Sequence, residues 1–250
     1  MLDPVFLRPI AHRGLHDAAK GVIENTAAAF EAAIAKGYAI ECDLVEAAGG
    51  LPVVFHDDTL DRLTERNGAI AHLAPGDLEH VRFKGSDSIG IPTFAAFLEF
   101  CEPRVPLVVE IKSNWRPPHP AFLHEIARLA LDHEGPIALM SFDPAVMAAL
   151  ARLAPAIPRG IVSGRYRDAD GTPWWPELSG WRTFCLRNLL EDRAAPPDFY
   201  AYEVGALPTL ATRFARWRNR PVLTWTVRSE TDRALAARHA DAPIFEGYEP

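Results

Sequence analysis

The sequence predicts an α/β fold and, within that class, a (β/α)8 TIM barrel. Short runs rich in β-branched residues alternate with alanine- and leucine-rich stretches, which indicates βα units around a parallel sheet. We count eight such units, and eight units in 250 residues match the usual size of this barrel. A doubly wound open sheet is the alternative, because strand order cannot be read from one sequence.

The predicted elements alternate along the chain with one interruption. The predicted strands are 8–12, 38–47, 51–57, 105–112, 137–142, 159–164, 199–204, 221–227 and 242–247. The predicted helices are 24–37, 93–101, 119–133, 144–154, 179–190, 209–219 and 229–239.

Local signals justify the least regular of these elements. Asn25 or Thr26 is the expected N-cap of the first helix, and Gly37 follows its end. The turn at Gly49 and Gly50 makes the second strand and its return strand a hairpin. Residues 58–92 are polar and glycine-rich, so we interpret them as a small insertion with at most a short helix near 75–81. Proline-rich stretches fit loops, so we expect one domain over 1–250.

Composition and charge limit the classes of function. Hydrophobic residues make up 48% of the chain, enough for a sizeable buried core. A net charge of −7 argues against nonspecific nucleic-acid binding, yet a few local cations or a metal ion could still bind a phosphate-bearing substrate. The longest apolar runs are far below the roughly 20 residues of a membrane helix, so no membrane span is predicted.

Cysteine usage and the N-terminal stretch bear on location. Cys42, Cys101 and Cys185 form no CxxC pair and no evident disulfide framework. The stretch MLDPVFLRPIAHRG lacks a basic region followed by a long apolar one, so we expect no signal peptide. We therefore predict a cytoplasmic protein, and its oligomeric state, including a homo-oligomer, stays open.

Charged and titratable side chains follow the early strands, at the ends that meet on the C-terminal face of a parallel barrel. They are His12, Arg13, Glu41, Asp43, His56, Glu110 and Lys112. Glu41 and Asp43 lie two positions apart, so they share one face of their strand while Cys42 points the other way. Barrel interiors favour branched apolar residues, and this charge therefore conflicts with a purely packing role.

These residue types suit a distinct chemistry. Three converging carboxylates form an oxygen-rich site for one hard divalent cation, Mg²⁺ or Ca²⁺. Two histidines that titrate near neutrality are suited to proton transfer, although they too could bind metal. Arg13 and Lys112 supply positive charge for an anionic group such as phosphate.

Each residue also has an ordinary structural interpretation. His12 could cap or pack, the two carboxylates of the second strand could pair with arginines, and Glu110 with Lys112 could form a surface ion pair. Their joint placement at strand ends favours function. The other histidines lie in predicted loops or on helix faces, and we interpret them as solvated: His16, His72, His80, His119, His124, His133 and His239. Trp174 and Trp175 are expected to pack within a loop. GxGxxG, GxxxxGK[ST] and GxSxG motifs do not occur.

The ordered motifs AHRG, ENT, ECD, VVFHDDTLDRLT and EIK resemble those of the glycerophosphodiester phosphodiesterases, and SFD and TWTV resemble that family's later strands. The resemblance runs from Ile10 to about Phe245 and implies a (β/α)8 barrel with a small insertion after the second histidine.

The resemblance also implies residue roles. His12 and His56 correspond to the general acid and base, and Arg13 and Lys112 to phosphate-contacting residues. The metal ligands would be Glu41, Asp43 and Glu110, and Trp225 would line the glycerol side of the pocket. Glu24 and Asn25 would brace the first loop.

Three features depart from the family's pattern or have no counterpart in it. The insertion is short, which would reduce the usual substrate cap. Glu246 stands in the final IFEGYEP, where many relatives carry an aspartate, and whether it substitutes is open. Arg165 or Arg167 could bind an anionic headgroup, although a solvated loop is the simpler interpretation.

The expected function is metal-dependent hydrolysis of a small-molecule glycerophosphodiester, such as glycerophosphocholine or glycerophosphoethanolamine, to sn-glycerol 3-phosphate and an alcohol. A neighbouring glycerol hydroxyl could attack first to give a cyclic phosphate, or water could attack directly. Two alternatives remain: a lysophospholipase D-like enzyme acting on lysophospholipids, and a catalytically silent barrel that binds phosphodiesters.

Overall fold

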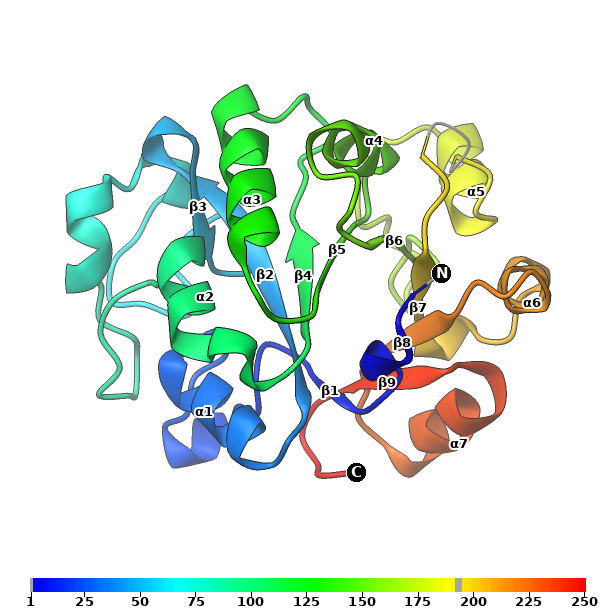
Figure 1. The fold of residues 1–250 in the computed structure, drawn as a ribbon, viewed down its shortest axis with the longest axis horizontal. Coiled ribbons are helices and arrows are strands. Elements are labelled where there is room, and N and C mark those ends of the chain that lie inside the picture. Colours follow the sequence, from blue (N-terminus) through cyan, green and yellow to red (C-terminus); the bar gives the residue numbers. More distant parts are fainter. Residues whose placement is uncertain (1, 192–194) are drawn as a thin grey trace.

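Eight parallel strands close into a barrel in the computed structural model, which describes residues 2–191 and 195–250 (Figure 1). The first strand pairs with the second on one side and with the last on the other, which closes the ring. The parallel strands are β1 (Ile10–Ala11), β2 (Ala39–Ala47), β4 (Leu107–Ile111), β5 (Ile137–Ser141), β6 (Arg159–Ser163), β7 (Phe199–Glu203), β8 (Val222–Val227) and β9 (Ala242–Phe245). The predicted barrel is confirmed, and the open sheet is excluded.

Helices surround this barrel in the order that the sequence predicts (Figure 1). They are α1 (Ala27–Ala35), α2 (Phe94–Cys101), α3 (Pro120–Asp132), α4 (Pro144–Leu153), α5 (Gly180–Arg187), α6 (Leu210–Trp217) and α7 (Glu230–His239). These seven α-helices correspond one to one to the seven predicted helices, and within the described residues the eight parallel strands correspond to the eight units that the sequence predicts. The first helix starts after Thr26, which takes the N-cap position in place of Asn25.

Alternation along the strands separates two apolar layers. Ile10, Ala39 and Val108 point into the barrel, whereas Ile40 and Cys42 point outward into the layer that packs against the helices. The inward face of β2 therefore continues from Ala39 to Glu41 and Asp43. This period of two carries the carboxylates of β2 to the mouth of the barrel, as predicted.

The insertion over 58–92 forms a small structure of its own. The return strand β3 (Leu51–Val54) pairs antiparallel with β2, which confirms the hairpin. Beyond it the chain makes 3₁₀ turns at Ile70–His72 and Pro75–His80, the second where a short helix was expected. Apolar side chains of the insertion pack together with those of the hairpin, so the excursion is ordered by its own core. None of the helices in the described ranges is long and apolar enough to cross a membrane.

The turn after β1 requires glycine at position 14. Gly14 has φ +79°, and a Cβ there would lie 2.8 Å from the carbonyl carbon of Ala29 at the start of α1. We expect Gly14→Ala to lower the free energy of unfolding by roughly 3 kcal/mol, since left-handed strain and a backbone clash add. Urea denaturation measures this loss. Gly37→Ala is the control, because its φ is +71° with open space around it and only the strain of roughly 1 kcal/mol applies. Equal losses in the two variants would contradict the packing argument.

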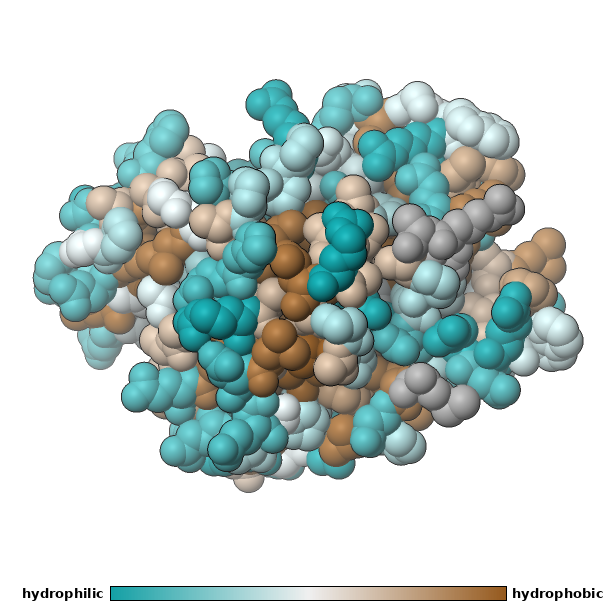
Figure 2. Space-filling model, turned by 45° about the horizontal axis from the view of Figure 1, so that its top comes forward, coloured by the Kyte–Doolittle hydropathy of each residue, from teal (hydrophilic) through white to brown (hydrophobic). Residues whose placement is uncertain are grey.

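Large apolar side chains remain exposed on two neighbouring helices. Trp181 and Phe184 on α5 and Leu210, Phe214 and Trp217 on α6 are all exposed. Figure 2 shows apolar surface at its right-hand edge, where these helices lie, next to hydrophilic surface. Isolated exposed apolar residues are common, but a group of five on adjacent helices is unusual for a protein surface.

Candidate active site

A cavity of about 600 Å³ opens at the C-terminal ends of the barrel strands. Six of the eight predicted site residues line it, namely His12, Arg13, His56, Glu110, Lys112 and Trp225. The other two, Glu41 and Asp43, are buried and contact the lining residues directly. The structure therefore brings together, in one place, every site residue that the sequence predicts.

One carboxylate oxygen from each of Glu41, Asp43 and Glu110 lies within 4.8 Å of the other two. Lys112 bridges two of them, with its Nζ 2.8 Å from Asp43 Oδ1 and 2.7 Å from Glu110 Oε1. Arg13 Nε approaches the other oxygen of Asp43 at 3.1 Å. Burial alone would raise the pKa of Asp43, but Lys112 and Arg13 hold it well below its usual range. Asp43 is therefore ionised at neutral pH.

The negative charge of Glu41 is the least balanced of the three, because the side chains of Lys112 and Arg13 pair with Asp43 and Glu110 instead. Burial, together with the neighbouring charges of Asp43 and Glu110, raises the pKa of Glu41 well above its ordinary value. Its Oε2 accepts a hydrogen bond of 3.0 Å from the backbone N–H of Arg13. Three carboxylates here share two cationic side chains. The donor set is thus hard, anionic and closely grouped, which fits a divalent cation such as Mg²⁺ or Ca²⁺.

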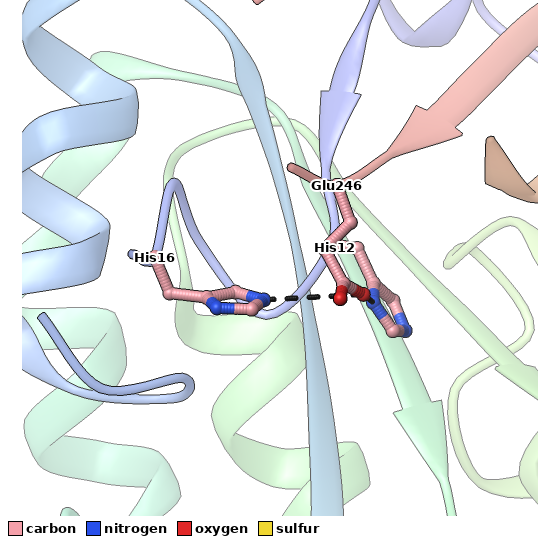
Figure 3. A group of neighbouring side chains, drawn as sticks. All are labelled: His12, His16 and Glu246. Carbon is pink, nitrogen blue, oxygen red and sulfur yellow. Dashed lines mark hydrogen bonds and ion pairs between the residues drawn. The ribbon is translucent and has the colours of Figure 1, made fainter. Parts of the chain in front are cut away.

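His12 is held by a carboxylate from the far end of the chain (Figure 3). Its Nδ1 lies 2.7 Å from Glu246 Oε2, and its Nε2 lies 3.9 Å from Glu41 Oε2. Burial lowers the pKa of His12 to about 4 in spite of the hydrogen bond to Glu246, so the ring is neutral at pH 7. With Nδ1–H donated to the carboxylate, Nε2 keeps a lone pair that can accept a proton.

Glu246 also binds a cation at the rim of the cavity. Arg228 Nη2 donates to the same Oε2 at 2.8 Å. Burial would raise the pKa of Glu246, but hydrogen bonds from His12 and Arg228 lower it far below the usual range, so the side chain is charged. The carboxylate in the position that the sequence left open thus contacts His12. Arg228 was not among the predicted site residues, although it follows the TWTV motif directly.

The expectation that His16 is solvated is wrong. Its side chain is only 15% exposed, and its Nε2 points toward Glu246 Oε2 at 4.0 Å (Figure 3). The tight turn at Gly14 folds the loop back over the end of β1, which brings this histidine to the outer side of the Glu246 carboxylate. A loop position in the sequence does not reveal such a return.

His56 sits at the end of a charged chain of contacts. Its Nδ1 lies 2.6 Å from Asp57 Oδ1, and Arg62 binds Asp57 through Nε at 2.6 Å. Arg62 also donates to Glu24, which in turn binds Arg13 Nη1 at 2.7 Å. Burial would raise the pKa of Asp57, but His56 and Arg62 lower it far below the usual range. This chain of alternating charges connects His56 to Arg13 through Glu24. Glu24 therefore contacts the insertion as well as the first loop, which it was expected to brace.

Aromatic side chains form the opposite side of the cavity. The lining side chains on this side are Phe142, Trp174, Trp175 and Trp225. The ring centroid of Phe142 lies 5.0 Å from that of Trp175 and 5.5 Å from that of Trp225. The prediction that Trp174 and Trp175 only pack within their loop is therefore incomplete, because both rings also face the cavity. Three of these four residues were not predicted to belong to the site. The signal for Trp174 and Trp175 in the sequence was their adjacency, whereas Phe142 stands in the SFD motif.

The two arginines suggested for an anionic headgroup are occupied elsewhere. Arg165 pairs with Glu203 through its backbone N–H and its guanidinium group. Arg167 is exposed and donates to the carbonyl of Gly171. Neither lines the cavity, in agreement with the simpler interpretation of a loop.

Known proteins resemble this chain in sequence and in structure. The glycerophosphodiester phosphodiesterase 1 of Bos taurus is 47% identical over 66 residues, a match that spans 26% of this chain and 19% of that protein. A phosphodiesterase of Oleispira antarctica, solved with the product sn-glycerol-3-phosphate, superposes with a TM-score of 0.72 at 21% identity, over 95% of this chain and 92% of that one. A glycerophosphodiester phosphodiesterase of Agrobacterium tumefaciens gives 0.65 at 20% identity, over 96% and 95%.

At such identities the structural likeness supports the barrel fold. The family itself is shown by a sequence model, that of the glycerophosphoryl diester phosphodiesterase family, which matches residues 12–245. This match includes both site histidines and all three carboxylates of the cavity. The chain therefore belongs to the glycerophosphoryl diester phosphodiesterase family.

Proposed function

We propose that the protein hydrolyses small glycerophosphodiesters, such as glycerophosphocholine or glycerophosphoethanolamine, to sn-glycerol 3-phosphate and an alcohol. The observation that carries this proposal is the convergence of two histidines, two cationic side chains and three carboxylates on one cavity. Family membership supports it, and so does the product found in the Oleispira relative.

The cationic side chains have the positions to bind the phosphodiester. Arg13 and Lys112 line the cavity and are fixed by buried carboxylates, so their charges are held in place before substrate arrives. Such preorganised charge stabilises the negative charge that develops on the nonbridging oxygens in the transition state. We propose that both contact these oxygens.

Proton transfer falls to the two histidines in this proposal. An attacking hydroxyl, from the neighbouring glycerol carbon or from water, forms the new bond to phosphorus and loses its proton to an imidazole nitrogen. The other imidazole gives a proton to the alkoxide oxygen as its bond to phosphorus breaks. The neutral state of His12, which follows from its burial, suits it to accept the first proton. The partner of His56, Asp57, stabilises a positive charge on that ring.

Glu41, Asp43 and Glu110 would hold the divalent cation. When bound, such an ion supplies Lewis-acid stabilisation of a phosphoryl oxygen. Their surplus negative charge and the raised pKa of Glu41 support this part of the proposal. The aromatic side, with Trp225, would contact the carbon skeleton of the glycerol half.

The test is product formation from a panel of substrates. The purified protein is incubated with glycerophosphocholine, glycerophosphoethanolamine and glycerophosphoglycerol in Mg²⁺ or Ca²⁺, and released glycerol 3-phosphate is quantified. Turnover of the soluble diesters supports the proposal. Turnover of micellar lysophospholipids alone would replace it with the lysophospholipase D alternative. Ligand-induced thermal stabilisation without product would favour a silent phosphodiester-binding barrel.

The contact between Glu246 and His12 yields a further prediction. Glu246→Gln is expected to lower kcat by about 10–100-fold, because the amide holds the ring of His12 less firmly and no longer favours the tautomer with the proton on Nδ1. Steady-state kinetics and the pH profile of kcat measure the effect, and Glu246→Asp should recover part of the activity. Glu249→Gln is the matched control, since Glu249 is exposed and pairs with Lys36. Unchanged kcat in Glu246→Gln would show that this contact does not position His12.

A further inference from the structure

Helix α6 presents its apolar side chains to solvent. Leu210, Phe214 and Trp217 recur at spacings of four and three residues, so they form one stripe, and they are 83%, 56% and 76% exposed. The face toward the barrel carries the smaller side chains of Thr212 and Ala215, which are buried. An amphipathic helix in a globular protein normally has the reverse arrangement. This inversion points to a surface that is covered by something other than the chain itself.

Helix α5 extends this surface. Trp181 and Phe184 are exposed there and their rings stack at 5.6 Å, as those of Phe214 and Trp217 do at 5.5 Å. The two helices follow β6 and β7, which are neighbouring strands, and they lie on the same side of the barrel (Figure 1). The exposed aromatic pairs therefore belong to two helices on the same side of the barrel (Figure 1).

Helix α6 is rich in arginine, although the whole chain has a net charge of −7. Residues 210–220 contain four arginines and no acidic residue. Arg216 is paired with Asp241 and Arg220 with Asp198, whereas the guanidinium of Arg218 lies over the ring of Phe214 at 5.9 Å. Arg187 on α5 and Arg213 on α6 are exposed and have no ion-pair partner within the described part of the chain. Cations that border exposed aromatic rings are suited to an anionic, partly apolar partner.

We propose that this α5–α6 surface docks the protein on an anionic lipid surface. The surface is defined by Trp181, Phe184, Leu210, Phe214 and Trp217 with Arg187, Arg213 and Arg218. Exposed aromatic and leucine side chains enter the headgroup region of a bilayer, and the surrounding arginines bind lipid phosphates. A second copy of the chain is the less favourable occupant, because an isologous contact would place the arginines of one copy against those of the other.

The α5–α6 surface is separate from the active-site cavity. None of its residues lines that cavity, so docking and hydrolysis can be measured independently. The inference does not rest on the proposed function, because it concerns lipid association of the folded protein. Variants in this surface are expected to keep the activity toward soluble substrates.

The experiment is co-sedimentation of the protein with vesicles of phosphatidylcholine alone or of equimolar phosphatidylcholine and phosphatidylglycerol. We expect binding to the anionic vesicles, weakened by about 0.5 M salt, and tryptophan quenching by brominated lipid. Phe214→Ser with Trp217→Ser should lower the partition coefficient at least about tenfold. Arg213→Gln should lower it about fivefold on anionic vesicles and leave weak binding to neutral ones unchanged.

Exposed apolar residues elsewhere provide the control. Ile89→Ser with Leu131→Ser removes two large exposed side chains outside the α5–α6 surface and should leave vesicle binding unchanged. Failure of the wild-type protein to bind anionic vesicles, or equal binding of the two double variants, would overturn the proposal. A dimer in light scattering that Phe214→Ser with Trp217→Ser separates would identify a second copy as the occupant instead. Wild-type quenching by brominated lipid needs no variant, so the proposal stays testable if a variant fails to fold.

Discussion

Replacing either histidine of the cavity with alanine is expected to lower kcat for glycerophosphocholine by about 10²–10⁴-fold. His12 contributes a neutral ring whose Nδ1 is bound by Glu246, and His56 contributes a ring whose Nδ1 is bound by Asp57. In the proposed mechanism each ring serves one proton transfer, and removing a ring leaves that transfer without the imidazole assigned to it. The measurement is steady-state release of glycerol 3-phosphate, with circular dichroism to verify folding.

A control histidine outside the cavity shows whether the loss of kcat is specific to His12 and His56. His80→Ala is the control, because His80 is exposed in the insertion and should leave kcat unchanged. The double variant of His12 and His56 is expected to lose less than the product of the single effects, since the two rings act in one reaction. Near-normal turnover in either single variant would refute the assignment of that histidine.

Chelation of divalent cations is expected to reduce hydrolysis at least about 100-fold, and Mg²⁺ or Ca²⁺ should restore it. The physical reason is the buried group of Glu41, Asp43 and Glu110, whose three carboxylates are only partly compensated by Lys112 and Arg13. Adding the cation should also raise the melting temperature, because binding to the folded state alone stabilises that state. Titration of each cation into chelated protein measures both effects.

A variant of the same site makes the metal prediction specific. Glu41→Gln keeps the size of the side chain and removes its charge, so the stabilisation by Mg²⁺ or Ca²⁺ should fall together with activity. Glu79→Gln changes an exposed carboxylate of the insertion and should leave both unchanged. Full activity of metal-free protein would contradict the site as described, even if hydrolysis itself is found.

The fold could be predicted because it depends on periodic signals. Alternation of strands and helices gave eight parallel strands, and the period of two in β2 placed Glu41 and Asp43 on the inward face. The site residues of β1, β2 and β4 follow from the same rule, since parallel strands end on one face of a barrel. Their proximity is therefore a consequence of topology. The roles of these residues, the domain limits and the cytoplasmic location remain predictions.

The remaining contacts depend on distant segments that no local pattern connects. Glu246 reaches His12 because β9 pairs with β1, a contact between residues 234 positions apart. His16 becomes largely buried because its loop folds back toward that same carboxylate. Trp174 and Trp175 face the cavity because a loop after β6 carries them over the barrel, and loop paths are not encoded by periodicity.

The closure of the barrel by β9 against β1 has a consequence for how activity arises during folding. The strand pair that completes the ring also brings Glu246 to His12, so in a partly folded chain with an open ring this histidine, the proposed base, would lack its carboxylate partner. Pairing of chain segments so far apart is a late and entropically costly event. Activity in this protein thus reports ring completion, and regained turnover during refolding should lag behind the recovery of helical signal. An open intermediate would then be poorly active until the last strand docks.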